Sequence, residues 1–199
     1  MKKNFILLLI YLGLIVIVFL IFKNWFSFYP LSSGDWSYKF PETIRGFTLY
    51  PYAWDAGFFN GLGGNMTFLL AINTYFLSTT SILFNFLHIP WVIIERIVWF
   101  WPFLIISVFS SYYLFKKLFS KKFALLSSFI FLFNTYILMI VGGGQMGIAM
   151  AYAFAPLVLY VFIKTIDFFN SSENIQYQIS NIKYPIFAGL LLSLQLIFD

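Results

Sequence analysis

The chain has 199 residues, of which 61% are hydrophobic, 24% aromatic and only 10% charged. Soluble domains carry about 25% charged residues, so this composition excludes an ordinary soluble domain and predicts an all-α, polytopic membrane protein. The net charge of +5 does not indicate a nucleic-acid partner, because the lysines gather beside apolar segments. The absence of cysteine excludes disulfides and thiolate metal sites.

The first apolar segment, residues 5–22, follows the basic start Met1-Lys2-Lys3. A hydrocarbon core roughly 30 Å thick needs about 20 helical residues, so this segment is long enough to cross it. A secretory signal begins in the same way, but no small-residue cleavage site follows. We therefore expect an uncleaved first membrane helix.

Residues 24–65 are expected to form a folded loop at the membrane surface. A disordered linker would lack the many aromatic residues of this stretch, and a membrane span would lack its acids. Its charged residues include Asp35, Glu42, Arg45 and Asp55. Residues 66–88 are rich in Phe and Leu but also in polar side chains. An interfacial or re-entrant helix and a helix packed inside a bundle both remain open for them.

Further spans are predicted at residues 91–115, 123–141, 147–163 and 184–199, which makes about five in total. Pro102 is expected to kink the first of these four. The run Gly142-Gly143-Gly144-Gln145 lacks the pattern of a phosphate loop and predicts a tight turn instead. Residues 164–183 are predicted to be a polar loop.

The distribution of charge predicts the orientation. With the N-terminus in the cytoplasm, the inside segments hold eight basic residues and the outside segments four. Basic residues concentrate on the cytoplasmic side of membrane proteins. We therefore expect an integral protein of a prokaryotic plasma membrane, with a cytoplasmic N-terminus and an extracytoplasmic segment at residues 24–90.

The last apolar segment is short. Residues 185–198 give about 21 Å of helix, less than a normal bilayer requires. We expect the chain to be the N-terminal portion of a longer protein, and a short, tilted terminal helix is the alternative.

The outside acids form the main candidate site. A carboxylate at a membrane surface can act as a general base on a hydroxyl or bind a divalent cation such as Mg²⁺ or Mn²⁺ beside a phosphate. Asp35 and Asp55, each next to a tryptophan, are the catalytic candidates, and Glu42 is a substrate-binding candidate. Arg45 can bind phosphate oxygens through paired hydrogen bonds. In the alternative interpretation, these charges pair with one another and fix the loop.

Glu95 and Arg96 are further substrate-binding candidates, because ionisable groups within a span often mark a site or an internal pair. Being adjacent, they point about 100° apart on a helix and need not pair. Interfacial snorkelling is an equal alternative for both. Gln145 is a candidate for lining an outside cavity, and His88 is interpreted as structural.

Several short stretches carry a resemblance to a known family. Gly34-Asp35-Trp36 opens a large outside loop after the first span, and the loop continues through Pro41-Glu42 and Trp54-Asp55. The later GGGQ turn is followed by Ala151-Tyr152-Ala153-Phe154-Ala155-Pro156-Leu157. This layout resembles polytopic glycosyltransferases of the GT-C type, including the YfhO-like group. The resemblance implies a lipid-linked sugar donor and a loop acid, Asp35 or else Asp55, as the catalytic residue. The loop lacks the adjacent acid pair of that family, which leaves metal dependence open.

The resulting hypothesis is an inverting glycosyltransferase that acts among membrane lipids on a polyprenyl-phosphate-linked sugar. Asp35 would take the acceptor proton, and Arg45 or Arg96 would steady the departing phosphate. Two alternatives remain open: a transporter or flippase-like protein, and a non-catalytic scaffold. The sequence specifies neither the sugar nor the oligomeric state.

Overall fold

The computed structural model describes residues 2–31, 34–35, 80, 83–84, 86–119, 121–170 and 183–198. Every regular element within these residues is a helix, which confirms the all-α class. Three of the candidate residues, Glu42, Arg45 and Asp55, lie outside the described residues. So does nearly all of the expected helix at 66–88.

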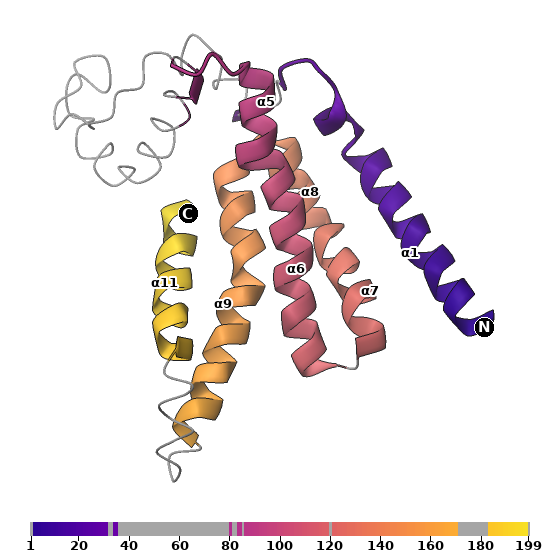
Figure 1. Ribbon diagram of the computed structural model, residues 1–199, viewed down its shortest axis with the longest axis vertical. Helices are drawn as coiled ribbons and strands as arrows, with labels where there is room; N and C mark the ends of the chain where they lie inside the picture. The colour runs from indigo at the N-terminus through magenta and orange to yellow at the C-terminus, as the bar shows by residue number, and fades with distance from the viewer. Residues whose placement is uncertain are drawn as a thin grey trace, which may run out of the picture.

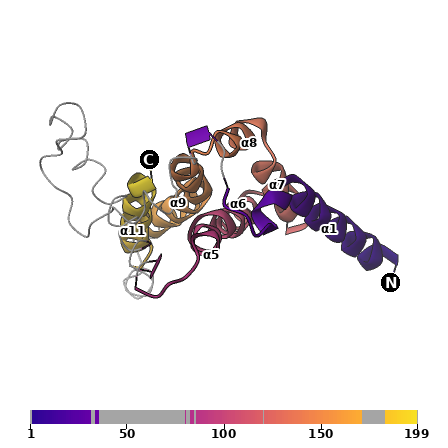
Figure 2. The same cartoon turned by 90° about the horizontal axis from the view of Figure 1, so that it is seen from above.

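The chain begins with α1 (Lys2–Ile21), followed by a single 3₁₀ turn, η1 (Lys23–Phe26). In Figures 1 and 2, α1 diverges from the other helices toward its N-terminus. Its C-terminal end contacts the other helices, since Phe22 and Trp25, which follow directly, belong to the buried core. The end of α1 is therefore fixed to the bundle while its first turns lie apart.

The next helix is continuous through residues 91–118 and consists of α5 (Trp91–Glu95), the π-helical segment η4 (Arg96–Phe100) and α6 (Trp101–Leu118). The wide turn of η4 ends at Phe100, two residues before Pro102. Proline lacks the N–H that an α-helix needs and crowds the carbonyl four residues earlier, here that of Val98. A π turn thus lies just before Pro102, and the kink expected there stays a prediction.

The bundle is completed by α7 (Lys121–Leu132), α8 (Thr135–Gly142), α9 (Met146–Asn170) and α11 (Lys183–Phe198). α6 packs against both α7 and α9, and α11 packs on α9 (Figure 1). The short connections at residues 119–120 and 143–145 place successive helices antiparallel. In Figure 1, α6, α9 and α11 run nearly parallel to one another.

Two helices are long and apolar enough to cross a membrane, residues 91–118 and residues 146–170, which contain 18-residue stretches with mean hydropathies of 2.0 and 2.1. A third span exists if α7 and α8, bent by 40°, are counted as one. In the described part of the chain, α1 contributes a shorter apolar helix, Leu9–Ile21. The structure thus supports two or three spans, and the fourth and fifth stay predictions.

The span expected at residues 123–141 is broken at Phe133 and Asn134. Asn134 accepts a hydrogen bond from the Ile137 N–H at 3.0 Å, so it is the N-cap of α8. Its amide donates to the Phe131 carbonyl and to the Tyr152 hydroxyl, at 2.5 and 2.8 Å. The expected span is therefore divided into two helices, α7 and α8, and Asn134 caps the start of the second.

The polar loop expected at residues 164–183 was wrong in its first part, because α9 continues to Asn170. Thr165 and Phe168 are buried on this extension. Asp167 forms an ion pair with Lys117 at the end of α6, with 2.9 Å between Nζ and Oδ2. Packing against α6 therefore extends the helix past the apolar segment.

The side chains of α6 are arranged inside out relative to a soluble protein, with polar residues buried in the bundle and large apolar residues exposed on its outer face. Ser107, Ser110 and Ser111 are at most 2% exposed, whereas Ile105 and Phe109 are more than half exposed. Large exposed apolar surfaces are rare on soluble monomers, and membrane helices pack through small residues. This arrangement is therefore that of helices whose outer faces meet lipid.

Candidate functional site

An aromatic cluster fixes the end of α1. The Trp25 ring lies 4.5 Å from Phe22 and 4.7 Å from Phe100, measured between ring centroids. The edge of Phe103 meets the same ring, and the Trp101 indole N–H donates to the Trp25 carbonyl at 3.3 Å. Burial of these rings anchors η1 against η4 and α6.

Glu95 and Arg96 form a buried ion pair within the same helix. The distance from Nη1 to Oε1 is 2.6 Å, and the two side chains are 0% and 4% exposed. Nη1 also donates to the Val92 carbonyl at 2.7 Å, and Glu95 accepts the Leu31 N–H at 3.1 Å. The adjacent charges therefore do pair, and the pair contacts the chain that follows η1.

Arg96 directs its other donors to this same incoming chain. Nε donates to the Trp25 carbonyl at 3.1 Å, and Nη2 donates to the Tyr29 carbonyl at 2.7 Å and the Ser27 hydroxyl at 3.3 Å. A guanidinium has five N–H groups, and all five of Arg96 now have acceptors within the chain. In this arrangement Arg96 has no donor left for a phosphate.

The run of glycines between α8 and α9 forms a Schellman turn, which confirms the predicted tight turn. The Gly144 N–H donates to the Val141 carbonyl and the Gln145 N–H to the Ile140 carbonyl, both at 3.1 Å. Gly144 has φ +76°, the left-handed conformation that this motif requires at its C′ residue. The turn leaves the Gly143 carbonyl free to accept from elsewhere in the chain.

Asp35 docks on this turn. Its N–H donates to the Gly143 carbonyl at 2.8 Å, and the Gln145 side chain donates to its carboxylate at 3.1 Å. The preceding residue, Gly34, has φ +49°, and a Cβ there would collide with the Gly143 carbonyl. Asp35 itself is exposed to the surroundings. Asp35 is therefore held through both its backbone N–H and its side chain, and its carboxylate stays accessible.

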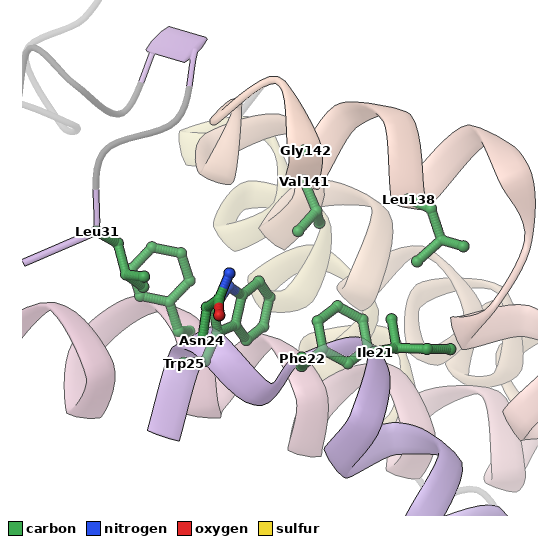
Figure 3. Close-up of a pocket in the computed structure, with 9 residues that line it drawn as sticks. Ile21, Phe22, Asn24, Trp25, Leu31, Leu138, Val141 and Gly142 are labelled. Atoms are coloured by element: carbon green, nitrogen blue, oxygen red, sulfur yellow. The ribbon is translucent and has the colours of Figure 1, made fainter. Parts of the chain in front are cut away.

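A pocket of about 270 Å³ with mixed polar and apolar walls lies beside this turn, between the end of α1, η4 and α8 (Figure 3). Asn24 contributes an amide to these walls, and Gly142 connects the pocket to the turn that binds Asp35. The volume is slightly below the 300–1,000 Å³ of common ligand sites. The pocket is lined by Ile21, Phe22, Asn24, Trp25, Leu31, Phe100, Leu138, Val141 and Gly142.

The structure brings the sequence candidates together in two groups, Asp35 with Gln145 and Glu95 with Arg96. Glu42, Arg45 and Asp55 lie in the part of the chain it does not describe. Within the described residues, no three His, Cys, Asp or Glu side chains approach as a metal-binding group.

Sequence reasoning missed the segment that Arg96 holds. The acceptors are mainly backbone carbonyls, which carry no signal of their own in a sequence. One indirect signal existed, because a buried arginine must find partners for its donors. The irregular residues after η1 have backbone groups in need of partners, and they lie at the same end of the membrane helices.

The apolar helices and the inside-out packing together indicate an integral membrane protein of the helical class. Comparison with protein-family models, with curated proteins and with solved structures found no match for this chain. The function therefore has to be argued from the site.

Proposed function

We propose that the protein is a membrane glycosyltransferase that uses a polyprenyl-phosphate-linked sugar, with Asp35 as general base. The observation that carries the proposal is the docking of Asp35: an exposed carboxylate at the end of the membrane helices, oriented by Gln145 and anchored at Gly143. An anchored carboxylate loses little freedom when it meets a substrate hydroxyl.

In the proposed step, Asp35 accepts the proton of an acceptor hydroxyl, and the acceptor oxygen bonds to the anomeric carbon of the sugar. The bond from that carbon to the phosphate oxygen breaks, and the polyprenyl phosphate leaves with the electron pair. The configuration at the anomeric carbon inverts. The apolar side chains of the pocket beside the glycine turn suit the lipid portion of such a donor. Because the donors of Arg96 are already used, Arg45 is the proposed phosphate partner.

Exchange of the Asp35 carboxylate for an amide tests the proposal. Asp35→Asn keeps the size of the side chain but removes the base, and base catalysis contributes roughly 10²–10⁴-fold. We expect transfer to fall by that factor. The measurement is release of polyprenyl phosphate by the purified full-length protein from a panel of polyprenyl-phosphate hexoses and pentoses, with membrane extract as acceptor.

Asp167→Asn is the matched control, because it makes the same chemical change at the far end of α6 and α9. It should leave transfer unchanged. An Asp35→Asn protein that transfers at the parental rate would refute the role of Asp35 as base.

A second candidate, a transporter or flippase-like protein, is favoured by the break between α7 and α8, since discontinuous helices are common in transporters. The same assay separates the two functions. A transporter moves the donor across a vesicle membrane chemically unchanged, whereas a transferase releases polyprenyl phosphate.

A further inference from the structure

The residues that follow η1 depend on α5 and η4 for their hydrogen bonds. Ser27 already has an extended backbone (φ −81°, ψ 165°), and no regular helix follows it through Leu31. Backbone groups outside regular structure need other partners wherever water is scarce. In residues 25–31, which we call the leading segment and which include the last two residues of η1, Arg96 and Glu95 bind the carbonyls of Trp25 and Tyr29 and the N–H of Leu31.

The contacts are spread along the whole leading segment. Arg96 binds the carbonyls of Trp25 and Tyr29, and Glu95 binds the N–H of Leu31. These three points span both ends of the segment and use both charges of the pair. One buried pair on η4 and α5 therefore fixes the position and direction of the chain as it leaves the membrane helices.

Asp35 follows only four residues after Leu31. Four extended residues span at most about 14 Å, so a fixed Leu31 confines where Asp35 can be. The second attachment, from Asp35 to Gly143, lies on the turn between α8 and α9. The chain is thus held at two places, the leading segment and Asp35. Attachment of the leading segment reduces the range of positions that Asp35 can occupy.

We infer that Arg96, paired with Glu95, is a positioning residue: it anchors the leading segment and so places Asp35 on the glycine turn. The meaning of this placement for catalysis rests on the proposed function, but the anchoring itself does not. This role differs from direct binding of substrate by Arg96, since every N–H of the guanidinium already contacts the chain.

Cross-linking tests the anchoring without any substrate. The 199 residues contain no cysteine, so the double variant Asp35→Cys, Gln145→Cys carries the sole thiols of this sequence, and any cysteine elsewhere in the full-length protein is replaced by serine. The parent side chains lie 3.1 Å apart between Oδ2 and Nε2, within reach of a short bifunctional thiol reagent. The yield of cross-linked peptide, measured by mass spectrometry on the full-length protein in membranes, reports how often residue 35 occupies the turn.

Adding Arg96→Gln should lower this yield about fivefold or more, the change expected when a contact that selects one conformation is lost. Arg96→Lys keeps the charge beside Glu95 but has three donors in place of five, so its yield should be intermediate. Lys117→Gln is the matched control, because it breaks an ion pair at the other end of α6. It should leave the yield unchanged.

An unchanged yield in Arg96→Gln overturns the inference. If Arg96→Gln fails to fold, as judged by size-exclusion chromatography, Arg96→Lys decides, and a parental yield there overturns it equally. A positioning role also predicts that Arg96→Lys lowers kcat for transfer while KM for the donor stays constant. Reduced cross-linking together with an active Asp35→Asn protein would refute the proposed function and keep the anchoring.

Discussion

At the scale of single residues, Gly34 determines whether Asp35 can reach the glycine turn. Its backbone has φ +49°, and the space where a Cβ would lie is occupied by the Gly143 backbone. Both features exclude a side chain. The neighbouring serines and tryptophan of the sequence give no hint of this contact, which joins residues 108 or more positions apart.

Gly34→Ala should destabilise the protein by about 1–2 kcal/mol, the cost of a left-handed conformation for a residue with a side chain, and more if Asp35 must leave the turn. Gly13→Ala is the control, because nothing lies within 4 Å of a Cβ at this position in α1. Alanine is the better helix former, so the control should be neutral or slightly stabilising. The measurement is thermal unfolding in detergent. Equal melting temperatures for the two variants would contradict the docking.

The two ion pairs of the described structure differ in their surroundings. Lys117 and Asp167 are 36% and 43% exposed, and such surface pairs contribute about 0–1 kcal/mol. Glu95 and Arg96 are buried, where removal of one partner leaves a charge without compensation. The first pair is therefore expected to tolerate substitution, whereas the second is not.

At the scale of elements, the wide turn of η4 lies near the end of the long helix that contacts the leading segment. π turns inside α-helices are frequent at functional sites. Here the turn begins at Arg96 and ends before Pro102, so one irregular stretch accommodates the proline and carries the arginine that holds the leading segment. Helical irregularity and anchoring thus come from the same residues.

Asn134 determines how α7 passes into α8. Its side chain caps α8 and bonds to Tyr152 of α9. Asn134→Ala should cost about 1–2 kcal/mol, from a lost N-cap and one interhelical hydrogen bond. Asn134→Ser retains a capping hydroxyl and should cost less. Thermal unfolding in detergent ranks these variants, and an Asn134→Ala protein as stable as the parent would show that the break does not depend on the cap.

At the scale of the whole molecule, the two ends of the bundle differ in chemistry. The leading segment, the glycine turn and Asp35 gather at one end, beside the start of α5 (Figure 1). The connection from α6 to α7 at the opposite end carries exposed lysines, Lys116, Lys117 and Lys121. The sequence-based prediction places the basic end in the cytoplasm, and this orientation stays a prediction.

Labelling of single cysteines tests this orientation. Phe28→Cys lies on the leading segment and Phe119→Cys on the α6–α7 connection. Both side chains are exposed, and both changes preserve charge. In intact cells, a membrane-impermeant maleimide should label Cys at position 28 directly and at position 119 only after permeabilisation. The reverse pattern would overturn the predicted orientation.

The sequence by itself determined the helical membrane class, the positions of most helices and the turn at Gly142–Gln145. These properties depend on local features: long apolar runs, proline, and a run of glycines that only a turn accommodates. The apolar runs therefore predicted spans at 91–115 and 147–163, which begin within one residue of the helices Trp91–Leu118 and Met146–Asn170, although the second helix continues seven residues further than predicted.

Tertiary structure alone decided how the candidate residues are used. Whether Arg96 binds a substrate or its own chain depends on carbonyls about 70 positions earlier, and whether Asp35 is held depends on a carbonyl and an amide about 110 positions later. Every residue has the same backbone carbonyl, so the pattern of side chains in a sequence does not predict which carbonyl will accept a hydrogen bond. The hydrogen bond from Asn134 to Tyr152 likewise depends on the packing of α9, which brings the two side chains within reach.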